Sequence, residues 1–166
     1  YSDVTHLDGL SNISYVGTTL TLRSNPNLTN VDGLSGIEQV DSLTIQDNDA
    51  LLELDGLIGL EMVDKKLMIY ANKTLESVGG LKNVSTSLTG ELNVGYNDAL
   101  LTLTGLQGVS QADKLTVVGN KMLANLSGLG LTKVASTIRI SSNESLNSLK
   151  GLEGLTKLQW DLYLEN

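Results

Sequence analysis

The sequence predicts a right-handed solenoid of about seven stacked turns, each 23–25 residues long. One parallel β-sheet is expected along one face, with loops and short 3₁₀ turns along the other. Two repeating columns and a spacing pattern predict this fold. An asparagine recurs at intervals of 23, 24, 25, 23, 23 and 23 residues, and a glycine at intervals of 24, 23, 24, 25, 23 and 23. Each repeat also ends with two apolar residues two positions apart, which is strand spacing.

The asparagine column predicts a buried ladder that joins the turns. An asparagine side chain both donates and accepts hydrogen bonds, so it can satisfy backbone groups of neighbouring turns inside a corner. The glycine column, from Gly9 to Gly151, indicates a corner with positive φ or a close approach between turns. The expected ladder residues are Asn25, Asn48, Asn72, Asn97, Asn120, Asn143 and Asn166.

The apolar spacing assigns structure within each repeat. Leu67 and Ile69, and the equivalent pair in every other repeat, should point inward from a short strand. Between Leu51 and Val63 apolar residues fall at every third position, which fits 3₁₀ turns or extended backbone rather than an α-helix. The sequence therefore predicts a leucine-rich-repeat solenoid with little or no α-helix.

The repeats together form one domain, 1–166. We expect this domain to be part of a longer chain, because neither end resembles the cap that usually closes a solenoid. The predicted repeats are 1–25, 26–48, 49–72, 73–97, 98–120, 121–143 and 144–166. The segment 84–91 makes one repeat the longest, and it is either a neutral loop or the border of a binding surface.

The repeat pattern N-x-x-L-x-x-L-x-G-L-x-x-I-x-x-V-x-x-x-L-x-I-x-x-N resembles receptor L-domain-like leucine-rich repeats along the whole chain. Such repeats occur in fungal GPI-anchored cell-wall proteins, in bacterial surface proteins and, more distantly, in the L domains of insulin and growth-factor receptors. The resemblance implies a recognition or adhesion module that is secreted or on the cell surface, including the cell wall. The receptor members are rich in disulfides, so the absence of cysteine favours a microbial or lower-eukaryote surface protein.

Composition excludes several kinds of partner. The formal net charge of −8 disfavours nucleic acid and anionic membranes, which bind basic patches. No apolar run of 18 residues is present, so membrane insertion is not expected. The absence of cysteine removes disulfides and thiolate zinc sites, and we expect no metal and no cofactor.

We expect no catalysis. The single histidine, His6, lies at the start of the chain, so we expect no serine or aspartate of the repeats to form an acyl-transfer dyad with it. A glycosidase with two carboxylates is the remaining enzymatic alternative. A shallow sheet face, however, provides little of the burial that raises the pKa of a carboxyl group.

Binding is expected on the outward face of the sheet, with a protein or a glycan as the ligand. The side chains between and beside the inward pairs point outward there, and those with most contact area are the best candidates. An ordinary solvated face, in a structural spacer, is the main alternative. The candidate ligand-binding residues are Arg23, Gln46, Met68, Tyr70, Asn93, Tyr96, Thr116, Arg139, Trp160 and Tyr163.

Three further hypotheses concern ice, calcium and glycosylation. Thr21, Thr44 and Thr116 share one outward column that could bind ice, although larger residues interrupt it. Oxygen ligands for calcium gather near one corner in 47–49 and 97–98, with Asp41 and Asp64 in the preceding loops, but solvated turn residues are the favoured interpretation. Sequons whose asparagine should be accessible to glycosylation are Asn12, Asn27, Asn83 and Asn125, whereas those at Asn72 and Asn143 should be buried.

Overall fold

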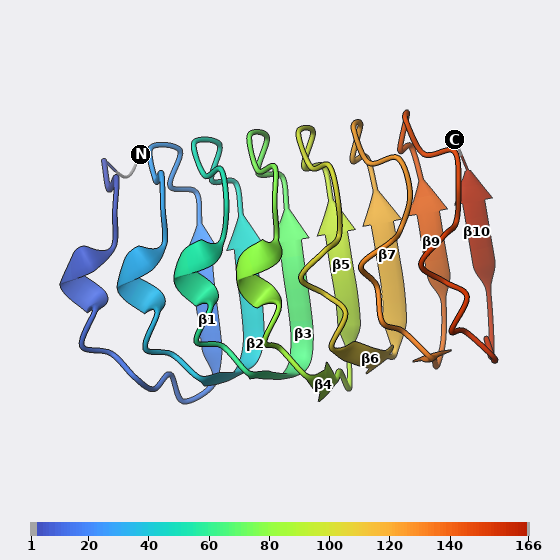
Figure 1. The fold of residues 1–166 in the computed structure, drawn as a ribbon, viewed down its shortest axis with the longest axis horizontal. Helices are drawn as coiled ribbons and strands as arrows, with labels where there is room; N and C mark the ends of the chain where they lie inside the picture. The colour runs from blue at the N-terminus through green and yellow to red at the C-terminus, as the bar shows by residue number, and fades with distance from the viewer. Residues whose placement is uncertain (1–2, 166) are drawn as a thin grey trace.

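The computed structural model describes residues 3–165, and it is a β-solenoid, as the sequence predicts (Figure 1). Seven parallel strands form one sheet in the order β1-β2-β3-β5-β7-β9-β10. The seven strands enclose about six turns of about 23 residues. The strands are β1 (Thr19–Arg23), β2 (Gln39–Gln46), β3 (Met62–Tyr70), β5 (Glu91–Gly95), β7 (Lys114–Val118), β9 (Ile138–Ser141) and β10 (Leu162–Glu165).

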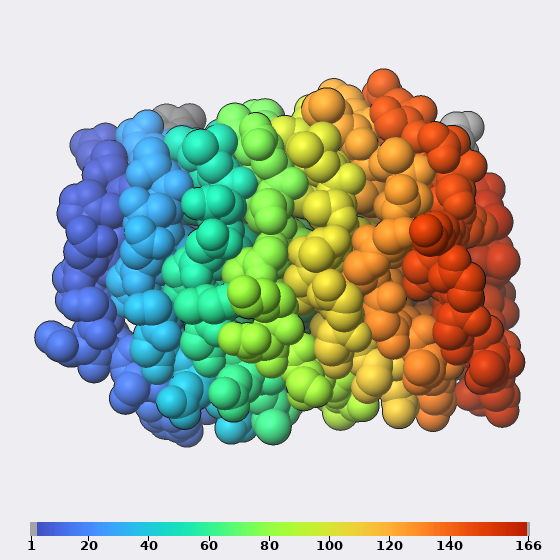
Figure 2. Space-filling model, in the orientation of Figure 1, coloured from blue at the N-terminus to red at the C-terminus, as the bar shows by residue number. Residues whose placement is uncertain are grey.

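The coil is right-handed. In Figure 1 each strand runs upward at the back, and the chain then crosses to the near side and descends before it joins the next strand. This is the hand expected for crossovers between parallel strands. Figure 2 shows the loop-bearing side, where successive turns pack as adjacent bands.

The wall opposite the sheet is made of short turns, as the three-residue spacing predicts. Each of the first four turns has a 3₁₀ segment, and no α-helix occurs in residues 3–165. The four segments are η1 (Asp8–Leu10), η2 (Asp32–Leu34), η3 (Asp55–Leu57) and η4 (Gly79–Leu81). The later turns cover the same side with turns that are not 3₁₀.

The repeating glycines occur for both of the expected reasons, a close approach between turns and a positive φ. A Cβ atom on Gly56 or Gly80 would collide with the backbone carbonyl of Val31 or Leu54 in the preceding turn, although neither glycine has a positive φ. Gly105 has the same kind of close contact and, in addition, a φ of 123°. Turns can approach this closely only where no side chain intervenes.

The prediction of a single sheet is incomplete. A second parallel sheet, in the order β4-β6-β8, is formed by β4 (Thr86–Ser87), β6 (Val109–Ala112) and β8 (Lys133–Val134). The long segment 84–91 supplies β4. Its Leu88 is buried, and the Leu88 amide donates to the carbonyl oxygen of Gln111 at 2.9 Å. The extra residues are thus largely paired structure rather than an open loop.

The predicted asparagine ladder is confirmed from Asn25 to Asn143, while Asn166 lies outside the described residues. In the middle of the ladder, Asn97 Oδ1 accepts from both N and Nδ2 of Asn72, each at 3.1 Å. Asn97 Nδ2 donates to the carbonyl oxygen of Ile69 at 3.0 Å and to Oδ1 of Asn120 at 3.2 Å. Asn48, Asn72, Asn97, Asn120 and Asn143 are fully buried. The ladder therefore satisfies buried backbone groups across successive turns.

The residue before each ladder asparagine has a left-handed backbone that the sequence did not reveal. Each has φ between 54° and 68°, a region that favours glycine, although five of the six are other residues. This conformation turns the chain out of the strand. The residues are Ser24, Asp47, Ala71, Tyr96, Gly119 and Ser142.

Replacing a central ladder residue should destabilise the solenoid strongly. In Asn97→Ala the Ile69 carbonyl and both donors of Asn72 lose a buried partner, and we expect the free energy of unfolding to fall by about 3 kcal/mol. Urea denaturation measures this loss. Asn83→Ala is the matched control, because Asn83 Nδ2 also donates to a carbonyl of the preceding turn but is exposed. Equal losses in the two variants would contradict a special contribution of the buried ladder.

Candidate functional site

The outward face of the seven-stranded sheet has regular columns, as the strand register shows. One column passes through the middle of every strand, and its residues are direct cross-strand partners. The three threonines of the ice hypothesis do lie in this column: Thr21 and Thr44 are neighbours, but Met68 and Asn93 separate them from Thr116. The column consists of Thr21, Thr44, Met68, Asn93, Thr116, Arg139 and Tyr163.

A hollow of about 440 Å³ lies on this face, over β3 to β10. It brings together five of the ten predicted ligand-binding residues: Tyr70, Asn93, Tyr96, Thr116 and Arg139. The remaining lining residues are Glu91, Lys114, Val118, Ser141, Ser142 and Glu165.

Two tyrosines form one side of the hollow, and each packs against a glycine of the next turn. A Cβ atom on Gly95 would lie 3.0 Å from the ring of Tyr70, and one on Gly119 would lie 2.7 Å from the ring of Tyr96. The two rings also meet edge to face, with centroids 5.1 Å apart. Glycines 95 and 119 thus make room for the rings and fix where they lie.

Glu91 organises the floor of the hollow. Its Oε1 accepts hydrogen bonds from Thr116 Oγ1 at 2.7 Å and from Asn93 Nδ2 at 3.3 Å. Lys114 Nζ lies 3.4 Å from the same oxygen. One carboxylate therefore connects β5 to β7 across the sheet surface.

Asn93 and Thr116 are more buried than outward residues were expected to be. Their exposed fractions are 8% and 7%. Asn93 Oδ1 is itself buried, and in residues 3–165 it is the one buried side-chain polar atom that has no hydrogen-bond partner. The amide orientation follows from the neighbouring Glu91, because a carboxylate can accept from the Asn93 nitrogen but would repel its oxygen.

Arg139 closes the other side of the hollow. Its Nη2 atom donates to Glu165 Oε2 at 3.0 Å, and its guanidinium lies 5.9 Å from the ring centroid of Tyr163. Tyr163 therefore orients Arg139 from outside the hollow.

Four other predicted binding residues lie apart from the hollow. Arg23 and Gln46 are on the first two strands, where both contact Asp47. Met68 is half-buried in β3, and Trp160 is exposed in the loop before β10. None of these four residues lines the hollow.

Three of the five aspartates of the calcium hypothesis pair with lysines. Asp41, Asp49 and Asp98 each lie 2.6–2.9 Å from a lysine Nζ of the next turn. These hydrogen bonds are the main cause of the raised pKa of the three lysines. No cluster of three or more potential metal ligands is found among the residues described. The pairs are Lys65–Asp41, Lys73–Asp49 and Lys121–Asp98.

The four sequons expected to be accessible differ in their surroundings. Asn12 and Asn27 are exposed. Asn83 is exposed but donates to the carbonyl oxygen of Ile58 at 2.9 Å, and Asn125 is half-buried and accepts from the amide of Ser127. A glycan on Asn83 would replace one of the two hydrogens of its amide nitrogen, which leaves one N–H for this contact.

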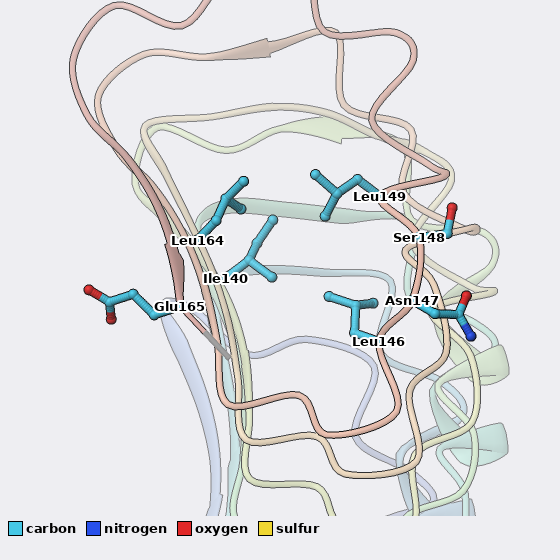
Figure 3. A pocket seen from close by; sticks show the side chains of 7 residues that line it. All are labelled: Ile140, Leu146, Asn147, Ser148, Leu149, Leu164 and Glu165. Atoms are coloured by element: carbon cyan, nitrogen blue, oxygen red, sulfur yellow. The ribbon is translucent and has the colours of Figure 1, made fainter.

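The C-terminal end of the solenoid has an apolar cavity of about 340 Å³ (Figure 3). Ile140, Leu146, Leu149 and Leu164 point into it, while Glu165 points away. Ile140 belongs to the hydrophobic core and Leu146 packs against it, and Asn147, Ser148 and Glu165 complete the lining. In the described part of the chain, no helix has the length and apolar character needed to cross a bilayer.

The sequence analysis did not select Glu91, Lys114, Glu165 or the two glycines beneath the tyrosines. A signal for the glycines was present: Gly95 and Gly119 fall outside the repeating glycine column, and each lies one turn after a tyrosine.

Adding a methyl group at Gly119 should displace the ring of Tyr96. In Gly119→Ala the Cβ would lie 2.7 Å from that ring, so we expect the Tyr96 ring signals to shift in an NMR spectrum and a stability loss of about 2 kcal/mol. Ser24→Ala, at the equivalent left-handed position of the first turn, is the control and should change neither. Unchanged Tyr96 signals would show that the ring does not occupy this position.

Comparison of the chain with protein-family models, with curated proteins and with solved structures found no match.

Proposed function

We propose that this protein is a non-catalytic recognition or adhesion module that binds a protein or a glycan over the hollow of its sheet face. One observation carries this proposal: the hollow combines two fixed tyrosine rings with a buried acceptor, Asn93 Oδ1, that has no donor. Buried polar groups are nearly always paired, so an unpaired one in a surface hollow indicates a place for a ligand group.

The scaffold suits binding because it holds these groups rigidly. Strands β5 and β7 are hydrogen-bonded on both sides, and the asparagine ladder fixes the corner that follows each. Side chains on such strands lose little freedom when a ligand binds.

The hollow favours binding over catalysis. Glu91 accepts hydrogen bonds from Thr116 and Asn93, so its oxygen is occupied by the protein's own donors. His6 lies in the first turn, where it pairs with Asp8 at 3.3 Å, whereas the hollow lies over β3 to β10. We therefore propose no chemical step here.

We further propose that the chain is a receptor L-domain-like leucine-rich-repeat protein, secreted or on the cell surface. The repeat pattern supports this assignment, and the net charge of −8 argues against nucleic acid as the partner. A structural spacer in a surface or cell-wall protein is the competing function. Ice binding has less support, because the middle column has only two adjacent threonines, Thr21 and Thr44, and Met68 and Asn93 separate these from Thr116.

The experiment compares two double variants on glycan and extracellular-protein arrays. Tyr70→Ala/Arg139→Ala removes one large group from each side of the hollow, and we expect the affinity for the captured ligand to fall about 100-fold. Leu101→Ala/Lys82→Ala is the control: it removes an exposed apolar group and a cation outside the sheet and should leave affinity unchanged. An absence of ligand on both arrays would contradict the proposal and favour the spacer.

A further inference from the structure

We propose that the hollow binds a short neutral oligosaccharide, one hydroxyl of which donates to Asn93 Oδ1. This inference rests on the proposed function and identifies its ligand class. Four features of the hollow support it: its charges are balanced, it offers both hydrogen-bond donors and acceptors, it contains two tyrosine rings, and it lies on the face of the sheet.

The charges of the hollow are balanced and already paired. Glu91 lies 3.4 Å from Lys114, and Arg139 lies 3.0 Å from Glu165. A charged ligand would have to compete with one of these pairs or leave a charge without a partner. A neutral ligand avoids both costs.

The polar groups of the floor match the chemistry of sugar hydroxyls, each of which can donate and accept. Asn93 Oδ1 offers an acceptor without a donor, while Lys114 and Arg139 offer N–H groups close by. The hydroxyl of Tyr70 can donate too, and burial raises its pKa further above neutral pH. An apolar ligand would leave Asn93 Oδ1 without a donor.

The two tyrosines provide the apolar part of the site. Their rings lie edge to face at an interplanar angle of 63°, so they present surfaces in two directions. A sugar ring has an apolar C–H face that can pack on an aromatic ring, while its hydroxyls reach polar groups at the edge. Tyr96, which is 45% exposed, has ring surface available for this contact.

The position of the hollow favours a saccharide over a peptide. Peptides that bind sheets through their main chain add to an unpaired edge strand. Most residues that line the hollow from strands lie instead on β5, β7 and β9, whose backbone groups are paired on both sides, and only Glu165 lies on the edge strand β10. From β3 to β10 there are four strand spacings, or about 19 Å, which suits a short oligomer lying across the strands.

Binding requires side chains that line the hollow to move, because Asn93 Oδ1 is covered in this structure. Lys114 and Arg139 have side chains that are 44% and 48% exposed, so both can change rotamer without unfolding. The backbone of the sheet need not move.

The experiment titrates the 166-residue chain with neutral and acidic saccharides. The neutral set comprises hexose and N-acetylhexosamine di- to tetrasaccharides, and the acidic set comprises uronic, sialylated and sulfated oligosaccharides. Binding is followed by NMR and calorimetry. We expect a neutral saccharide to bind, to shift the ring signals of Tyr70 and Tyr96, and to bind at least about tenfold more weakly to Asn93→Leu.

Stability distinguishes a binding role for Asn93 from a structural one. Asn93→Leu removes a buried oxygen that has no partner and one long hydrogen bond to Glu91, whose carboxylate keeps Thr116 and Lys114, so the melting temperature should stay unchanged or rise. A clear fall would show that the amide is structural and would overturn the inference. Asn83→Leu, the same exchange on an exposed residue outside the sheet, should leave saccharide affinity unchanged.

The possible outcomes separate this inference from the proposed function. Preferential binding of acidic saccharides, or of a protein whose binding depends on Tyr70 and Arg139, would overturn the inference and leave the recognition module intact. A neutral saccharide that binds Asn93→Leu as tightly as the wild type would also overturn it. The absence of any ligand in these titrations and on the arrays would overturn both.

Discussion

The buried chain of asparagine amides determines how the turns are placed, and the rest of the structure depends on that placement. Asn72, Asn97 and Asn120 each donate to a strand carbonyl of the preceding turn at 3.0 Å, and each has an Oδ1 that accepts from the preceding asparagine. Because one amide joins each pair of turns, the strands keep a constant register. That register aligns inward residues into a continuous core and outward residues into columns. Residues about 23 positions apart in the sequence thereby become neighbours one strand spacing apart.

A regular frame of this kind makes the departures from regularity informative. Most positions of the outward columns carry a side chain, but Gly95 and Gly119 do not, and the rings of Tyr70 and Tyr96 occupy the space. The glycines of the repeating column allow the backbones of successive turns to approach closely, whereas Gly95 and Gly119 allow a tyrosine ring to pack against the backbone. The hollow forms beside the rings because side chains of β5 and β7 are drawn toward Glu91. Its shape thus results from few substitutions in an otherwise repetitive surface.

Sequence periodicity predicted the structural features that recur in every repeat, but it could not predict features that occur in only some of the turns. The strand pairs, the ladder and the turns of the opposite wall recur in every repeat, so periodicity reveals them. Strands β4 and β8 have two residues each, too few to show any periodicity. Five of the ten candidate binding residues line the hollow, because the outward direction follows from alternation along a strand. The burial of Asn93 and Thr116 could not be predicted in this way, since it depends on the rotamers of side chains on neighbouring strands.

Asn93 and Asn97 show that the same residue type serves two purposes four positions apart. Both are buried, but Asn97 uses its amide nitrogen and oxygen in hydrogen bonds to neighbouring turns, while Asn93 Oδ1 has no donor. An unpaired buried acceptor costs about 1–3 kcal/mol. An apolar side chain would avoid that cost at Asn93, as Met68 does at the adjacent position of the same column. Replacing Asn93 by an apolar residue of similar size would therefore stabilise the fold. The same replacement at Asn97 would not, because it would leave the buried backbone and amide partners of Asn97 without hydrogen bonds. The cost at Asn93 is recovered only when a donor arrives from outside the chain, which is the physical basis for placing recognition at this residue.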